Sequence, residues 1–309
     1  MYEDYNYNKN EDLNHCLICK KAFNEGDSVS IIELPKGPFK LVCRACLKEA
    51  EKLISMDTNV QKAVTRTTEG LKEVDKLWRY MDLAKFISML KDSNLFFSSP
   101  KGFNDIYEGA HGELRNKKAW DDFYLSHARA AIITAPDNCW HYIDESKLEE
   151  EAQRLVSEIT TLQTPVFISC WYQNDYESEA MWKMYSKNVA NAIAIQTDYK
   201  ELKRQIGDKA KINKVMYIDY SKRFVGPNEL FWYKRKSFEY EREVRALLHS
   251  FGNNDSLGIA MKVDLESLIK GVYISPYAPE WFYSCVVDLI DKYGYKFEVN
   301  YSSMTALPF

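Results

Sequence analysis

The sequence lacks any apolar run close to the roughly 20 residues that span a bilayer, and it carries no excess of positive charge. Residues 1–14 are acidic and rich in Asn and Tyr, without the basic and apolar regions of a signal peptide. The formal net charge is -4 over 309 residues, so no overall positive field draws the chain onto nucleic acid or an anionic membrane. We therefore expect a cytoplasmic protein that does not bind membranes.

Common nucleotide-binding signatures are absent as well. The chain contains no phosphate-binding loop, no Gly-x-Gly-x-x-Gly fingerprint and no internal repeat. Three of its seven cysteines, Cys139, Cys170 and Cys285, are scattered along the sequence, so a disulfide framework is not expected. With 46% hydrophobic residues, the chain is apolar enough for one large globular domain and a small one.

The other four cysteines form two close pairs, Cys16 with Cys19 and Cys43 with Cys46. Each pair places two thiolates on a tight turn, which is half of a tetrahedral zinc shell. An iron-sulfur cluster would call for further clustered cysteines, and reduced structural thiols would not explain the paired spacing. His15 lies beside a ligand and could replace one, although such a histidine is more often exposed. A closed shell of four thiolates leaves no position for water, so we expect a structural zinc ion.

The segment around these cysteines resembles a treble clef. Two expected strands, 28–34 and 39–42, flank a Pro- and Gly-rich turn, and a helix is expected to begin at Leu47. Basic residues surround the cysteines: Lys20, Lys21, Lys40, Arg44 and Lys48. Such a cluster suits phosphate contacts but is more often a solvated face. It supports one interpretation of the whole chain, a non-enzymatic protein or nucleic-acid binder.

Composition and periodicity indicate a zinc-binding module at 1–50, a helical connector at 51–72 and a larger domain at 73–309. Expected strands of the larger domain are 77–80, 95–98, 166–171, 190–196, 215–220, 241–248, 259–263, 272–275 and 296–299. Expected helices are one after Asp82, then 113–134, 143–161, 177–186 and 279–292. This irregular alternation predicts an α+β domain with a mixed, bent sheet and flanking helices.

Polar residues interrupt several of these apolar strands. Glu241, Glu243 and Arg245 alternate along one expected strand, which would place all three on one face with the carboxylates about 7 Å apart. Such a row is either a solvated salt bridge or a site that aims a carboxylate at a substrate hydroxyl. Arg79 and Ser169 also lie within apolar strands and need partners if they are buried. Taken singly, each of the two also fits an ordinary structural role.

Several short motifs follow one another from residue 77 to the C-terminus. They are 77–80, 95–100, 103–105, 167–169, 181–182 with Tyr185, Lys234, Phe238, Glu241, Glu243, Arg245 and 274–276. In this order they resemble the bacterial family called domain of unknown function 2971. The family usually has Pro where Ile106 stands, His where Met184 stands and Trp where Phe238 stands, so any role of that His is in doubt here.

The domain also resembles ADP-ribosyltransferases, which have Arg or His on the first strand, a Ser or Tyr motif on a middle strand and Glu-x-Glu late. Here the order is Arg79, Ser169 and then Glu241 with Glu243. This resemblance implies an NAD-dependent ADP-ribosyltransferase or NAD glycohydrolase with a macromolecular acceptor, of the kind found in bacterial toxins and phage-defence effectors.

The resemblance also implies a role for each residue. Glu243 would stabilise the oxocarbenium ion that forms when the nicotinamide-ribose bond breaks, and Glu241 would steer the acceptor. Arg79 would clamp a phosphate or ribose of NAD, and Ser169 would orient the nicotinamide side. The residues expected to bind NAD are Arg79, Tyr80, Trp171 and Tyr185. Arg79, Ser169 and Glu243 are expected to line one cleft.

A third interpretation is a metal-dependent nuclease that uses Glu241, Glu243 and Lys234. It has the weakest support, because no Asp at a strand end precedes a Glu-x-Lys triplet. Convergence of Arg79, Ser169 and Glu243 in one cleft would separate the transferase from the binding protein.

Overall fold

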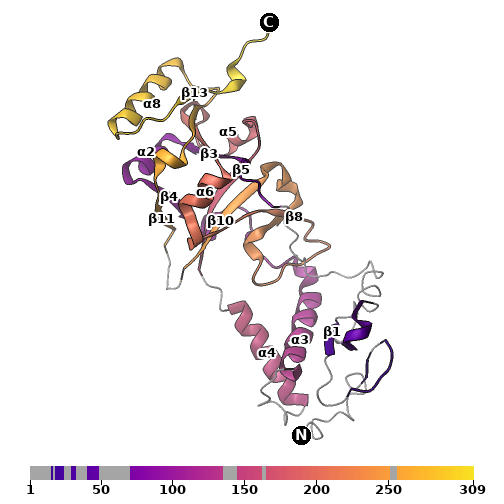
Figure 1. Ribbon diagram of the computed structural model, residues 1–309. Coiled ribbons are helices and arrows are strands. Elements are labelled where there is room, and N and C mark those ends of the chain that lie inside the picture. The colour runs from indigo at the N-terminus through magenta and orange to yellow at the C-terminus, as the bar shows by residue number, and fades with distance from the viewer. Residues whose placement is uncertain are drawn as a thin grey trace. The chain divides into compact units, whose positions relative to one another are not determined.

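The computed structural model describes residues 15–16, 18–23, 29–32, 40–48, 70–134, 145–161, 165–250 and 256–309 (Figure 1). These residues fall into two units. The first draws on Met1–Val64, His111–Gln163 and Asp219–Asn228, and the second on Thr65–Ala110, Thr164–Ile218 and Glu229–Phe309. Most of the predicted connector, 51–69, lies outside the described residues, and the predicted domain limits stay a prediction. Among the described residues, no helix has the length and apolar content needed to cross a membrane.

The strands are β1 (Val29–Ile32), β2 (Lys40–Cys43), β3 (Lys76–Asp82), β4 (Asn94–Ser98), β5 (Val166–Gln173), β6 (Ala192–Asp198), β7 (Lys211–Lys214), β8 (Met216–Ile218), β9 (Tyr233–Arg235), β10 (Glu243–His249), β11 (Gly258–Lys262), β12 (Gly271–Ile274) and β13 (Val299–Tyr301). The α-helices are α2 (Leu83–Asp92), α3 (Lys117–Thr134), α4 (Glu145–Thr161), α5 (Glu179–Met184), α6 (Tyr199–Ile206), α7 (Leu265–Leu268) and α8 (Glu280–Lys292). Short 3-10 helices include η3 (Arg44–Cys46) and η9 (Lys236–Glu241).

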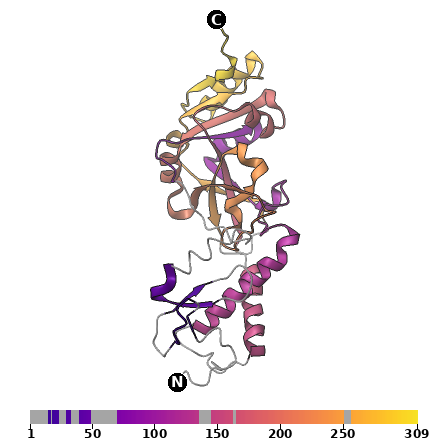
Figure 2. The ribbon, with the colours of Figure 1, turned by 90° about the vertical axis from the view of Figure 1, so that its right-hand side faces the viewer.

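The first unit contains the cysteine segment and a helix pair. Strands β1 and β2, drawn in indigo in Figure 2, pair antiparallel with Val29 opposite Cys43. Helices α3 and α4 pack through buried apolar residues one turn apart, Ala128 with Ile132 on α3 and Leu148 with Ala152 on α4. The expected helix after residue 47 is described only at residues 47 and 48, where the backbone is helical.

The second unit is built on one bent, mixed sheet in which β5 is central. Strand β10 pairs antiparallel with β5, from Glu243 opposite Tyr172 to His249 opposite Val166. On its other side β10 pairs antiparallel with β7. On its opposite edge β5 pairs with β3 near its end, Trp78 opposite Tyr172, and with β4 nearer its start, Ser98 opposite Ile168. The sheet therefore forks between β3 and β4. Beyond β3 lie β6, β12 and β13, and the β12–β13 pair is parallel.

The two faces of this sheet carry different side chains, because neighbours along a strand point to opposite sides. One face, called the core face below, carries Leu77 and Trp171 within a large buried apolar cluster to which α2, α6, α7 and α8 contribute. The other, called the α5 face, carries Trp78 and Tyr172, which cluster with Trp182 of α5. Each face is thus closed by helices over the sheet.

Local sequence signals explain how β3 leads into the first helix of this unit. The carboxylate of Asp82 accepts a hydrogen bond from the Lys85 backbone N–H at 3.0 Å and so caps α2. Phe86 and Leu90 are one turn apart and buried, which anchors the helix on the core face. Ser93, in the left-handed conformation at φ 46°, ends the helix before β4.

The expected mixed sheet with flanking helices is confirmed, and most expected strands and helices lie within a few residues of their predicted bounds. The strand expected at 296–299 is shifted to Val299–Tyr301, where it pairs parallel with β12, and the rings of Tyr295 and Phe297 before it stack at 4.9 Å and pack with the core. Helices α6 and α7 and strands β7 and β9 were not predicted.

Glu241 requires a correction. It does not belong to a strand but ends the 3-10 helix η9, and β10 begins only at Glu243. Between them, Arg242 adopts a left-handed conformation at φ 38°. The regular alternation expected for Glu241, Glu243 and Arg245 is therefore broken by a turn.

Candidate functional site

The four paired cysteines meet in the first unit. Their sulfur atoms all lie within 4.8 Å of one another, and the Sγ atoms of Cys19 and Cys43 are 3.9 Å apart. Four thiolates around zinc at about 2.3 Å stand about 3.8 Å apart in a tetrahedron. The cluster therefore has the size of a four-thiolate metal site. The spacing of the two pairs, Cys16 with Cys19 and Cys43 with Cys46, predicted that the four thiols would meet.

Backbone hydrogen bonds shape the first cysteine pair. The N–H of Lys20, whose φ is 59°, donates to the carbonyl of Cys16 at 3.0 Å, and the N–H of Cys16 donates to the carbonyl of Lys21 at 2.9 Å. The N–H of Cys43 donates to Sγ of Cys16 at 3.4 Å, a contact that favours the thiolate form. The hairpin thus brings the end of β2 onto the first pair.

A second candidate site is a group of buried charges in the second unit, called the ion cluster here. Glu243, at the start of β10, is 4% exposed, and its carboxylate accepts from Nε of Arg245 at 2.7 Å and from Nη2 at 3.1 Å. Nζ of Lys234 on β9 donates to the same carboxylate at 3.3 Å and also to Glu241. Arg245 is fully buried. Glu108, in the loop after β4, completes the cluster by accepting from Nη2 of Arg245 at 2.9 Å.

The ion cluster carries more negative than positive charge. Its carboxylates are those of Glu108, Glu241 and Glu243, and its cations are Lys234 and Arg245, so the formal sum of two positive and three negative charges is -1. Burying charge is costly unless it is paired and hydrogen-bonded. A positively charged group brought to this cluster would therefore be stabilised.

The two neighbouring glutamates ionise differently. Burial opposes ionisation of Glu243, but the charge and hydrogen bonds of Arg245, together with Lys234, hold its pKa down at about 2. Burial raises the pKa of Glu241, and Lys234 only partly offsets that rise. Burial, and then the charges of Glu241 and Glu243, raise the pKa of the Tyr185 phenol, which places Tyr185 in the field of both carboxylates. Carboxylates whose pKa values are pushed apart in this way are suited to different roles in one reaction.

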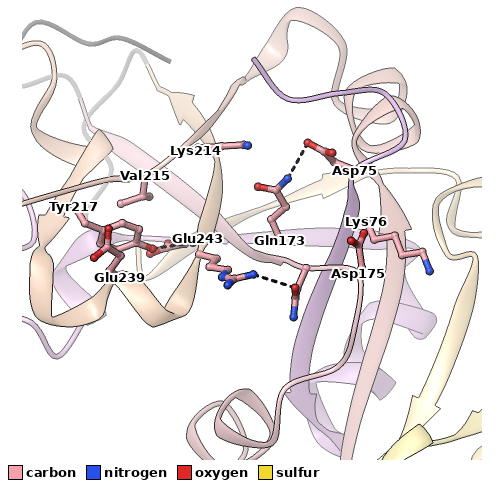
Figure 3. A pocket seen from close by; sticks show the side chains of 11 residues that line it. Asp75, Lys76, Gln173, Asp175, Lys214, Val215, Tyr217, Glu239 and Glu243 are labelled. Carbon is pink, nitrogen blue, oxygen red and sulfur yellow. Dashed lines mark hydrogen bonds between the residues drawn. The ribbon is translucent and has the colours of Figure 1, made fainter. Parts of the chain in front are cut away.

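A polar pocket of about 580 Å³ lies where β3 and β10 begin and β5 and β7 end (Figure 3). It is lined by Asp75, Lys76, Gln173, Asn174, Asp175, Lys214, Val215, Tyr217, Glu239, Arg242 and Glu243. Within it, Gln173 donates to Asp75 at 2.8 Å, and Nη1 of Arg242 donates to Asn174 at 3.1 Å. This volume falls within the range of about 300 to 1,000 Å³ typical of small-molecule sites.

Pocket and ion cluster share Glu243. The hydroxyl of Tyr217, which also lines the pocket, accepts a hydrogen bond from the N–H of Glu243 at 2.8 Å (Figure 3). Burial raises the pKa of Tyr217, the hydrogen bond from that N–H opposes the rise, and the charge of Glu243 adds to it. The pocket therefore borders the charged cluster through these two residues.

Arg79 forms hydrogen bonds across the fork in the sheet. Its Nη1 donates to the hydroxyl of Ser169 on β5 at 3.0 Å, and its Nη2 donates to the carbonyl of Phe96 on β4 at 2.8 Å. The guanidinium also lies 5.7 Å from the ring centroid of Trp171, and burial lowers the pKa of Arg79. Arg79 thus bridges β3 to β4 and β5 where backbone pairing between the strands is interrupted.

The expectation that Arg79, Ser169 and Glu243 line one cleft is wrong. On β5, Tyr172 lies opposite Glu243 and belongs to the α5 face, whereas Ser169 lies opposite Ala246 and belongs to the core face. Arg79 contacts Ser169 on that core face. The three residues do occupy neighbouring strands, but the period of two along each strand sends Glu243 to the other side.

The remaining predicted site residues also lie on different faces of the sheet. Trp171 lies on the core face with Arg79, while Tyr80 clusters on the α5 face with Trp182, its ring 4.9 Å away. Tyr185 lies near the ion cluster, since the charges of Glu241 and Glu243 act on its phenol. Glu241 and Glu243 are brought together through Lys234. The structure thus keeps four of the predicted residues, both glutamates and both tyrosines, on the side of the ion cluster.

Sequence reasoning did not select Glu108 or Tyr217 as site residues. One available signal was that Arg245 stands between Val244 and Ala246 in an apolar strand, where a guanidinium needs more than one acidic partner. Which distant carboxylate supplies the second charge depends on a loop that closes over the strand, and no local pattern reveals it.

Arg79→Ala is expected to lower stability by about 1 to 3 kcal/mol and to leave any affinity for NAD unchanged, because it removes the donor to the Phe96 carbonyl and one of the two donors to the Ser169 hydroxyl, the other being Nε1 of Trp171. Thermal melting followed by circular dichroism, and calorimetry with NAD, measure the two effects. The matched control is Arg204→Ala on α6, whose loss of an exposed ion pair with Glu201 should leave the melting temperature nearly unchanged. If Arg79→Ala lowered the affinity for NAD and left stability unchanged, Arg79 would be a ligand-binding residue after all.

No model of a known protein family matches the chain, and no curated protein matches it. Among solved structures, the chain is similar to "Thermus sp. 2.9 DarT in complex with ADP-ribosylated ssDNA", at 8% identity and a TM-score of 0.36. The similarity covers 78% of this chain and 100% of that chain. At this TM-score the similarity carries no conclusion about fold or function.

Proposed function

We propose that the second unit is an NAD-dependent ADP-ribosyltransferase-like enzyme that breaks the nicotinamide-ribose bond of NAD. The observation that carries this proposal is the ion cluster, with its formal charge of -1, at the border of the polar pocket. The nicotinamide ring of NAD is cationic, and bond cleavage moves that positive charge onto the ribosyl carbon. A fixed excess of negative charge stabilises such a transition state.

Each glutamate has a distinct role in this proposal. Glu243 is ionised at neutral pH, because the charge and hydrogen bonds of Arg245 outweigh burial and hold its pKa down at about 2, and its charge stabilises the oxocarbenium ion. The bond electrons leave with nicotinamide, which departs as a neutral base. An acceptor hydroxyl or amine then bonds to the ribosyl carbon, and its proton passes to Glu241, whose raised pKa suits a general base. Tyr185 and Tyr80 flank this side of the sheet as aromatic contacts.

The pocket offers groups that match the rest of NAD. Lys76, Lys214 and Arg242 are cationic and suit the diphosphate. The carboxylates of Asp75 and Asp175 are acceptors for ribose hydroxyls. This mixed lining supports binding of a ligand that has both phosphates and hydroxyls.

The wild-type protein tests the proposal directly. Calorimetry should detect binding of NAD, and chromatography should detect release of nicotinamide, which water as acceptor allows even when the macromolecular acceptor is unknown. The proposal would be contradicted if the protein neither binds NAD nor releases nicotinamide from it. Binding without release would instead indicate an NAD-binding protein that does not react.

We propose further that the four-cysteine cluster holds one zinc ion that stabilises the first unit. The donor set supports zinc, because four thiolates at these separations match its preferred coordination and leave no open position for chemistry. Membership of the domain of unknown function 2971 family, a cytoplasmic location and a role as toxin or defence effector also remain proposals.

A second candidate function is a non-enzymatic binder of nucleic acid or protein through the cysteine segment. It is favoured by exposed basic side chains around the cluster, those of Lys20, Lys21, Arg44 and Lys48. Fluorescence anisotropy with a labelled single-stranded oligonucleotide tests the nucleic-acid form. Binding that weakens steeply with salt and with Arg44→Glu, but not with changes at Glu243, would support it.

A further inference from the structure

Glu108 enters the ion cluster from a loop, whereas Lys234, Glu243 and Arg245 lie on strands and Glu241 ends η9. Its carboxylate is 3% exposed, and it accepts from both Nη1 and Nη2 of Arg245, the latter at 2.9 Å. Nη1 of Arg245 also donates to the carbonyl of Phe231 at 2.6 Å. With Nε and Nη2 directed to Glu243, the guanidinium has polar partners on every nitrogen. Its orientation is therefore determined by groups from three segments.

The loop backbone is shaped for this contact. Gly109 follows Glu108 with φ at 78°, and a Cβ atom there would stand 2.8 Å from Cε1 of Phe231. A side chain at this position would collide with the residue whose carbonyl accepts from Arg245. The glycine thus lets the loop approach closely enough for Glu108 to reach the guanidinium.

A second ion pair holds the same loop outside the ion cluster. Asp105 accepts from Nη2 of Arg235 at 2.7 Å, and the Arg235 side chain is 38% exposed. The carboxylate of Asp105 also accepts from the N–H of Tyr107 at 3.1 Å, which forms a local turn. Neither contact involves Arg245 or Glu243. Asp105 therefore offers a matched comparison: an acidic residue of the same loop whose ion pair is with Arg235 and not with a member of the ion cluster.

We propose that Glu108 is a positioning residue that holds the guanidinium of Arg245 and supplies the excess negative charge of the ion cluster. Without Glu108, two carboxylates would face two cations, and the formal sum of the cluster would be zero instead of -1. Arg245, which already donates to Glu243 through Nε and Nη2, would then share its charge with no second carboxylate of the cluster and would neutralise Glu243 more fully. This inference rests on the proposed function for its kinetic consequence, while the contact itself can be tested without any activity.

The test compares Glu108→Gln with Asp105→Asn. Nitrogen-15 NMR of arginine side chains should show slowly exchanging Nη protons of Arg245 in the wild type, because the guanidinium is bonded on both sides. In Glu108→Gln these protons should exchange at least tenfold faster, and kcat for nicotinamide release should fall about 10- to 100-fold with KM within threefold. Asp105→Asn should lower the melting temperature but keep the Arg245 signals and kcat within twofold.

Every outcome of this comparison decides the proposal. Unchanged exchange and kcat in Glu108→Gln would overturn it, and so would equal kinetic losses in both variants. If Glu108→Gln does not fold, Glu108→Asp replaces it: its shorter side chain should also speed Nη exchange of Arg245, and unchanged exchange would overturn the contact. Fast Nη exchange in the wild type alone would overturn it as well. Absence of nicotinamide release by the wild type would contradict the proposed function but leave the NMR result to decide whether Glu108 positions Arg245.

Discussion

Glu243→Gln is expected to slow nicotinamide release roughly a hundredfold while changing the affinity for NAD little. The amide keeps the size and part of the hydrogen bonding of the carboxylate, but it removes the charge that faces the developing cation. Losing about 3 kcal/mol of transition-state stabilisation corresponds to that factor. Single-turnover release and calorimetry separate the chemical step from binding.

Stability must be followed in the same experiment. Glu243 is 4% exposed and paired with Arg245 and Lys234, so its substitution also costs folding free energy. Rates should therefore be measured well below the melting temperature and scaled to the folded fraction. Glu280→Gln, at the exposed start of α8, is the control and should leave release and melting unchanged. Full activity of folded Glu243→Gln would contradict the assigned role.

The second large effect is expected at the cysteine cluster, where Cys43→Ser should abolish binding of one zinc ion per chain. Thiolate-zinc bonding supplies on the order of 10 kcal/mol or more to small zinc modules, which are often unfolded without metal. We expect amide signals of the described residues between 15 and 48 to collapse to unfolded positions, while the melting transition of the second unit persists. Elemental analysis in reducing buffer and NMR measure the two results.

Cys285→Ser is the matched control, because this exposed cysteine of α8 lies outside the cluster. It should keep the zinc content at one per chain. Wild-type protein without metal would contradict the zinc site. Loss of the second unit's melting transition in Cys43→Ser would instead show that the two units depend on one shared core.

Several features of the fold followed from local patterns. Asp82 was recognisable as a helix cap, because its short carboxylate precedes a run of apolar residues at helical spacing, and it does cap α2. The turn at Arg242 was not recognisable, because an arginine at φ 38° has no sequence signature. That turn takes Glu241 out of the strand, yet Lys234 still joins it to Glu243 from β9. The pairing of the two glutamates was thus predicted, but through a different geometry.

Spacing along the chain was enough to predict that the four cysteines cluster, because the two pairs are joined by one hairpin, β1 with β2, that brings them together. The side of the sheet on which Arg79 and Glu243 lie was beyond any local pattern. Strand side chains alternate with a period of two, so a shift of one residue in pairing exchanges the faces. That pairing joins segments as distant as β3, β5 and β10, and the long-range contact of Glu108 with Arg245 arises in the same way. Such contacts are set by the packing of the whole domain.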